Sequence, residues 1–122
     1  ATIVSVGSMA PHAAEAAELL AGQGINVSVI DLRTLVPLDI TTVLDDVCRT
    51  GCLFTVEENP RLCGWGAEIA SIVAEESFDH LDGPIVRITT PHIPMPFAES
   101  LEDAALPSVA RIVHTVSARL SA

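Results

Sequence analysis

Two adjacent carboxylates and a glycine-rich turn lie close together near the middle of the chain. Glu57 and Glu58 follow the apolar residues 53–56. Gly64 and Gly66 come a few residues later, just before a helical pattern begins. A pair of carboxylates is typical of general acid–base catalysis. Glycines between a strand and a helix are typical of loops that bind phosphate. The stretch therefore suggests two kinds of chemistry, proton transfer and anion binding.

The spacing argues against both kinds of chemistry. Neighbouring side chains in a strand point to opposite faces, so the two carboxylates would not converge on one substrate. The phosphate-binding pattern needs a third glycine where this chain has Ile69, and a bulky tryptophan separates the other two glycines. We expect Gly64 and Gly66 to permit close helix packing. We also expect a subunit interface at the end of the third strand, formed by Glu57, Glu58, Arg61 and Trp65.

A second group of acidic residues follows the glycine-rich turn by about two helical turns. The predicted helix ends in an acidic cluster that consists of Glu75, Glu76, Asp79 and Asp82. Carboxylates near a helix C-terminus face the negative end of the helix dipole, at a cost of about 0.3–1 kcal/mol each. A basic partner would offset this cost, and a solvated acidic face is the alternative. The sequence therefore predicts a partner-docking surface at these four residues.

Metal and disulfide sites are not indicated. The histidines show no ligand spacing: His12, His80, His92 and His114. The three cysteines, which cannot all pair, are expected to be buried and reduced: Cys48, Cys52 and Cys63. Arg33 is expected to fix a turn by bonding loop carbonyls or a carboxylate, and Asp39 is expected to cap a helix.

Strands and helices alternate along the chain. Apolar runs predict strands at residues 2–6, 26–32, 52–56 and 85–89, and 3.6-residue periodicity predicts helices at 11–23, 40–50, 67–78 and from Ser108 onward. The proline-rich segment 90–107 is expected to be an extended loop without a helix. Strands that are apolar nearly throughout indicate a parallel sheet covered on both faces. The predicted fold class is α/β, a three-layer α/β/α sandwich with a mostly parallel sheet of four to five strands.

The composition limits the class of protein. Hydrophobic residues make up 49% of the 122 residues, enough for one domain with a real core. No apolar run approaches the roughly 18 residues of a membrane span. A net charge of −10 argues against binding to nucleic acid or anionic lipid. We expect residues 1–122 to form a single cytoplasmic domain of a longer protein.

Several motifs carry a family resemblance, in order over nearly the whole chain. They are VIDLRTLVPLD at 29–39, GWGAEI at 64–69, LDGP at 81–84, PMPF at 94–97 and LP at 106–107. The chain resembles the C-terminal, transketolase-type domain of the beta subunit of thiamine-diphosphate-dependent 2-oxoacid dehydrogenases, of the pyruvate, branched-chain or acetoin type. The resemblance implies a sheet with the second strand first, then the first, third and fourth. In the family an antiparallel edge strand precedes the first strand predicted here.

The resemblance also implies a role. Such enzymes are oxidoreductases that decarboxylate a 2-oxoacid and pass the acyl group to lipoamide. They bind thiamine diphosphate and Mg²⁺ mainly outside this domain, so no catalytic or cofactor-binding residue is expected here. The implied partners are a second beta subunit, an alpha subunit and the peripheral subunit-binding domain of dihydrolipoyl acyltransferase. In related pyruvate enzymes an acid at the position of Asp82 contacts that partner. Many relatives have Asp where this chain has His92.

Two alternatives remain at this stage. One is a stand-alone anion- or nucleotide-binding domain that uses Gly7, Ser8 and the turn at 64–66. The other is the same domain in a transketolase or a deoxyxylulose-phosphate synthase.

Overall fold

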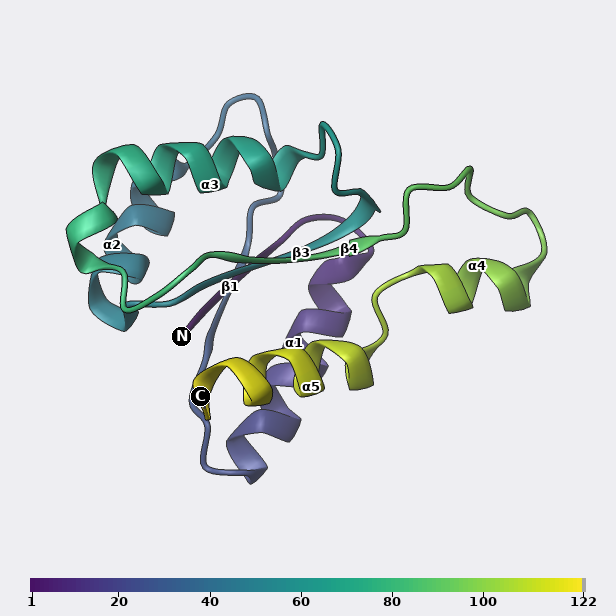
Figure 1. The fold of residues 1–122 in the computed structure, drawn as a ribbon, viewed down its shortest axis with the longest axis horizontal. Helices are drawn as coiled ribbons and strands as arrows, with labels where there is room; N and C mark the ends of the chain where they lie inside the picture. Colours follow the sequence, from purple (N-terminus) through teal and green to yellow (C-terminus); the bar gives the residue numbers. More distant parts are fainter. Residues whose placement is uncertain (122) are drawn as a thin grey trace.

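The computed structural model describes residues 1–121, in which a parallel sheet is covered by helices on both faces (Figure 1). The sheet has the strand order β2-β1-β3-β4, with β1 at Thr2–Ser5, β2 at Ser28–Asp31, β3 at Leu53–Pro60 and β4 at Val86–Thr90. All neighbouring strands pair in parallel, which confirms the expected order. The direction of the strand order reverses between β1 and β3, where contacts and ligands gather in such folds.

Two pairs of helices form the outer layers. Helices α1 (Met9–Gly22) and α5 (Val109–Leu120) cover one face, and α2 (Ile40–Thr50) and α3 (Trp65–Glu76) cover the other (Figure 1). Alternation along β3 supplies both cores, because successive side chains of a strand point to opposite faces. Phe54 and Val56 pack beneath α1 and α5, whereas Leu53 packs beneath α2 and α3. Both faces of the sheet are therefore buried, as the apolar strands predicted.

Local sequence determines where several helices begin and end. The Asp39 carboxylate accepts a hydrogen bond from the backbone N–H of Thr42 at the start of α2. Gly51 ends the same helix in the left-handed conformation, with φ of 71°. Ser108 caps α5 by accepting a hydrogen bond from the backbone N–H of Arg111. These start and stop residues match those expected from the sequence.

The expectation of a helix-free segment at 90–107 is wrong, because helix α4 (Glu99–Ala105) lies within it. The prolines of the segment flank this stretch and leave its backbone N–H groups free to bond. Helix α4 and the loop before it project away from the rest of the chain (Figure 1). They carry exposed apolar side chains, namely Ile93, Met95, Phe97 and Leu101.

Two further expectations need correction. The cysteines are free thiols, but Cys48 and Cys63 are exposed and Cys52 is only partly buried. The helical spacing predicts that Cys48 is buried with the apolar stripe of α2, but Cys48 lies at the margin of that stripe and is exposed. Helix α3 ends at Glu76, and a short 3₁₀ helix, η1 (Phe78–His80), leads on to β4.

No helix among residues 1–121 is long and apolar enough to cross a membrane.

Candidate functional site

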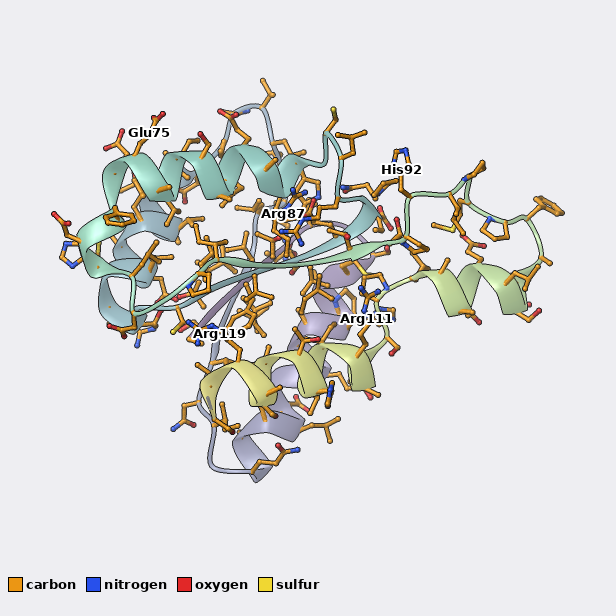
Figure 2. The ribbon with its side chains drawn as sticks, viewed as in Figure 1. Glu75, Arg87, His92, Arg111 and Arg119 are labelled. Carbon is orange, nitrogen blue, oxygen red and sulfur yellow. The ribbon has the colours of Figure 1, made fainter. Side chains whose placement is uncertain are left out.

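The carboxyl edge of the sheet contains a buried ion pair between Glu57 and Arg87. The sequence placed Glu57 just beyond a strand that ended at residue 56. Strand β3 instead continues to Pro60, so Glu57 lies within it. Its side chain has 0% exposure. Arg87 of β4 donates from Nε to Oε1 and from Nη2 to Oε2 of Glu57, both at 2.8 Å. Figure 2 shows Arg87 between the sheet and α3. The bidentate geometry is the strong form of this ion pair.

Three more donors complete the surroundings of the Glu57 carboxylate. The Thr55 hydroxyl donates to Oε1 at 2.8 Å. The Asn59 amide donates to Oε2 at 3.0 Å, and the backbone N–H of Gly66 donates to Oε2 at 3.1 Å. A buried charge is tolerated when it is paired and its remaining lone pairs are bonded. The network joins β3, β4 and the first turn of α3.

The two positions of the turn require glycine because the ion pair lies against their Cα atoms. A Cβ atom built on Gly64 would lie 2.5 Å from Glu57 Oε2 and 2.7 Å from Arg87 Nη2. A Cβ atom on Gly66 would lie 2.6 Å from Glu57 Cδ and 2.8 Å from Thr55 Oγ1. Real Cβ atoms do not approach so closely. The turn therefore closes over the ion pair, which explains the spacing of its glycines.

This arrangement decides between the chemical hypotheses for the turn. The Glu57 carboxylate already occupies the Gly66 N–H that a phosphate would need, so the diphosphate of thiamine does not fit this turn. Glu57 is fully paired and has no free lone pair directed at a substrate. Glu57 has no exposed surface and forms an internal ion pair, and its predicted role at a subunit interface stays a prediction.

Glu58 lies on the opposite face of β3, as the alternation of strand side chains predicted. It is exposed and accepts a hydrogen bond from the Ser8 hydroxyl after β1. Arg61 is exposed and Trp65 is partly buried, so both are accessible at this edge. Their role in a subunit interface, with Glu58, stays a prediction. Arg33 bonds the Asp31 carboxylate at 2.7 Å, with a positive φ of 61°.

The carboxyl group of Glu57 has a pKa below its ordinary value of 4.5. Burial by itself raises this pKa, because it disfavours the charged form. Hydrogen bonds from Arg87, Thr55, Asn59 and the Gly66 N–H favour the charged form and outweigh the effect of burial. The carboxylate is therefore ionised at neutral pH and stabilises the fold.

This shift predicts acid sensitivity of the fold. When the folded-state pKa is lowered, the stabilisation is present above the unfolded-state pKa and is lost as pH falls toward the folded-state value. We expect the free energy of unfolding to fall as the pH drops below about 4.5. Chemical denaturation between pH 7 and pH 3 would measure it. Glu57→Gln should show a weaker pH dependence than the natural chain. An equal pH dependence in both would contradict the assignment to Glu57.

Sequence reasoning missed Arg87. It is the one charged residue in the expected strand 85–89, and such a residue needs a carboxylate partner if it is buried. Its partner lies 30 positions away along the chain, and only the parallel pairing of β3 with β4 brings the two together. A cation within an otherwise apolar strand could have pointed to Glu57.

The predicted acidic cluster lies at the opposite end of the sheet, where α3 ends and β4 begins. All four of its side chains are exposed. The Asp82 N–H donates to Gly51 O at 2.8 Å, so Asp82 lies against the C-terminus of α2. Figure 2 shows Glu75 at this end of α3, far from His92 on the other side. The four residues thus follow one another from the last turn of α3, through η1, to the turn before β4.

The charges of this cluster have no internal counterpart. The three ion pairs found within residues 1–121 involve other carboxylates, those of Asp31, Asp46 and Glu57. Asp82 adds its charge beside the negative end of α2, which costs about 0.3–1 kcal/mol. In the same described part of the chain, no group of three His, Cys, Asp or Glu residues could hold a metal ion.

The chain matches a protein-family model over most of its length. The model of the family "Transketolase, C-terminal domain" matches residues 1–112. Among solved structures, the chain is similar to one described as a split gene transketolase, inactive beta4 tetramer, with a TM-score of 0.77 and 29% identity. The similarity covers 98% of this chain and 38% of that one.

Curated relatives include several beta subunits. The chain is 48% identical to the pyruvate dehydrogenase E1 component subunit beta of Rhizobium meliloti, over 97% of this chain and 26% of the relative. It is 43% identical to the mitochondrial counterpart of Dictyostelium discoideum, over 93% and 32%. It is also 43% identical to the acetoin:2,6-dichlorophenolindophenol oxidoreductase subunit beta of Cupriavidus necator, over 91% and 33%. The chain thus spans about a quarter to a third of the length of these relatives.

Proposed function

Because the chain belongs to the transketolase C-terminal domain family, we propose that it serves as the assembly and docking domain of the beta subunit of a 2-oxoacid dehydrogenase. In this proposal the whole enzyme decarboxylates a 2-oxoacid and transfers the acyl group to lipoamide. Thiamine diphosphate and Mg²⁺ supply the decarboxylation chemistry and are bound by other domains. This domain joins the beta subunits, has the alpha subunit as a further partner, and docks the peripheral subunit-binding domain of dihydrolipoyl acyltransferase.

The observation that carries the docking role is the exposed acidic cluster, whose carboxylates form none of the ion pairs found within residues 1–121. Glu75 and Glu76 lie in the last turn of α3, and Asp82 lies against Gly51 at the end of α2, where negative charge is least favourable. A positively charged partner removes this cost and is attracted from a distance by a chain of net charge −10. Nucleic acid and anionic membranes would be repelled by the same charge.

The assembly role is supported by the other end of the sheet. The loops after β3 and β4 expose Leu62 at 68%, Phe97 at 103% and Ile93 at 49%. These side chains lie on the same edge as Arg61 and Trp65. Exposed apolar groups rimmed by polar residues are typical of protein–protein contacts. A subunit contact that covers this edge would bury them.

Sequence identity favours the dehydrogenase proposal over a transketolase. The beta subunits named above share 43–48% of the residues, whereas the transketolase structure shares 29%. The anion-binding alternative is disfavoured, because the turn that would bind the anion already holds the Glu57 carboxylate.

We expect Asp82→Lys to weaken docking of the acyltransferase subunit-binding domain at least about tenfold at low salt, because it places a cation opposite the partner's basic residues. The difference should shrink as the salt concentration rises, since exposed charges are screened. Calorimetric or surface-based binding measurements at several salt concentrations would show it. Circular dichroism should show an intact fold, because Asp82 bonds Gly51 through its backbone N–H.

Glu99→Lys is the matched control for this experiment. It makes the same change in net charge on α4, which projects from the other side of the molecule (Figure 1). It should change the affinity far less than Asp82→Lys. Equal effects of the two variants would contradict a docking site at the acidic cluster. Binding of nucleotides or thiamine diphosphate, without binding of the acyltransferase domain, would support the anion-binding alternative.

A further inference from the structure

An apolar hollow lies where α3 ends and β4 begins, and its lining residues are interspersed along the chain with those of the acidic cluster. It has a volume of about 340 Å³ and is lined by Ala74, Phe78, Leu81, Gly83, Pro84 and Ile85. Phe78 is 69% exposed, although it lies at the start of η1 beside these apolar groups. An aromatic side chain left open to solvent beside a hollow is typical of the centre of a protein–protein contact.

The charges around the hollow indicate what covers it. Glu75 and Glu76 precede Phe78, and Asp79 and Asp82 follow it, so carboxylates flank the apolar lining on both sides along the chain. Arg119 of α5 lies over Gly83 at the margin, but it forms no ion pair with these acids. A second copy of this acidic chain would bring like charges together. The occupant must therefore be apolar at its centre and positively charged around it.

We infer that the hollow receives one aliphatic or aromatic side chain from a partner segment in which lysines or arginines flank that side chain. The inference rests on the proposed docking function and specifies the chemistry of the partner. The apolar side chain packs against Phe78, Leu81 and Ile85. The flanking cations extend their methylene stems along the rim and place their charged groups at the carboxylates. Affinity then comes from the hollow, while the acidic cluster supplies attraction and orientation.

The test is Phe78→Ala in the protein, with the acyltransferase subunit-binding domain as the binding probe. The affinity should fall roughly tenfold or more, as is typical of a buried aromatic anchor. Because no charge changes, the salt dependence of binding should stay as in the natural protein. Asp82→Asn, in contrast, removes a charge and should make the affinity depend less on the salt concentration. Phe78 is mostly exposed, so its replacement should leave the fold intact.

Two further variants make the test specific. Ala74→Leu adds a good helix former on α3 and fills the hollow, so it should weaken binding while Phe78 and all charges remain. Leu101→Ala removes an exposed apolar side chain of α4, which is 58% exposed, and should leave the affinity unchanged.

The outcomes separate the inference from the proposed function. If the natural protein binds the probe and both Phe78→Ala and Ala74→Leu bind equally well, the docking function holds and the apolar anchor is wrong. If the natural protein does not bind the probe, the docking function and the inference both fail. Loss of affinity in both variants, with unchanged salt dependence, supports the inference.

Discussion

Replacing Glu57 with alanine is expected to lower the free energy of unfolding by about 3–5 kcal/mol, because it leaves the Arg87 guanidinium buried without its counter-charge. Arg87 lies largely buried, with 9% side-chain exposure, and water can reach it poorly. The Thr55 hydroxyl and the Gly66 N–H would also lose their acceptor. Urea or guanidinium denaturation at neutral pH, with the fold checked by circular dichroism, measures the change.

The neighbouring residue gives the matched control for this prediction. Glu58→Ala removes the same chemical group one position away, where the side chain is exposed, and should change the stability by no more than about 0.5 kcal/mol. The pair Glu57→Leu with Arg87→Met should recover part of the loss, because it removes both charges together. A Glu57→Ala variant as stable as Glu58→Ala would show that the ion pair contributes nothing measurable.

Gly66→Ala is expected to destabilise the fold by about 3 kcal/mol or more, since overpacking of 1–3 kcal/mol adds to displacement of a buried charge. The new methyl group would meet the Glu57 carboxyl carbon at 2.6 Å and push it from Arg87. Alanine is the better helix former, so a loss of stability in the first turn of α3 must come from this clash. Thermal and chemical denaturation would both report it.

Gly22→Ala is the matched control and is expected to stabilise the same chain. Gly22 ends α1, and a Cβ atom there would have no neighbour within 4 Å. Its replacement should stabilise the protein by up to about 1 kcal/mol. If Gly66→Ala also stabilised the chain, the carboxylate of Glu57 would not lie against the turn as described.

Much of the fold follows from local sequence. The caps at Asp39 and Ser108 and the stop at Gly51 depend on residues within one turn of each helix, so the sequence shows them directly. Apolar runs located all four strands, and the family resemblance supplied their order in the sheet. That resemblance, to beta subunits of 2-oxoacid dehydrogenases, is confirmed by the relatives at 43–48% identity.

The wrong predictions concern residues whose surroundings depend on more than the neighbouring sequence. Glu57 appeared to be a strand-end carboxylate because its partner, Arg87, is 30 positions away and reaches it only through the sheet. The glycines at 64 and 66 resembled a phosphate loop because the atoms that exclude a side chain belong to β3 and β4. Helix α4 was missed because the surrounding prolines dominated the interpretation of a short proline-free stretch.

The acidic cluster can be identified from the sequence alone. Glu75, Glu76, Asp79 and Asp82 are close in sequence, so their clustering needed no tertiary information. The hollow beside them was not foreseen, because it depends on how η1 turns the chain and leaves Phe78 exposed. Whether these acids bind a partner stays a prediction, and the variants of Asp82 and Phe78 are designed to decide it.

The hollow and the acidic cluster have a consequence for how such a protein changes over evolution. Every residue that forms them lies in the single continuous stretch 74–85. Substitutions there can redirect partner choice without altering the buried ion pair or the apolar edge at the other end of the sheet. Under the proposed docking function, transplanting this stretch between relatives should transfer docking preference while the host keeps its own subunit contacts.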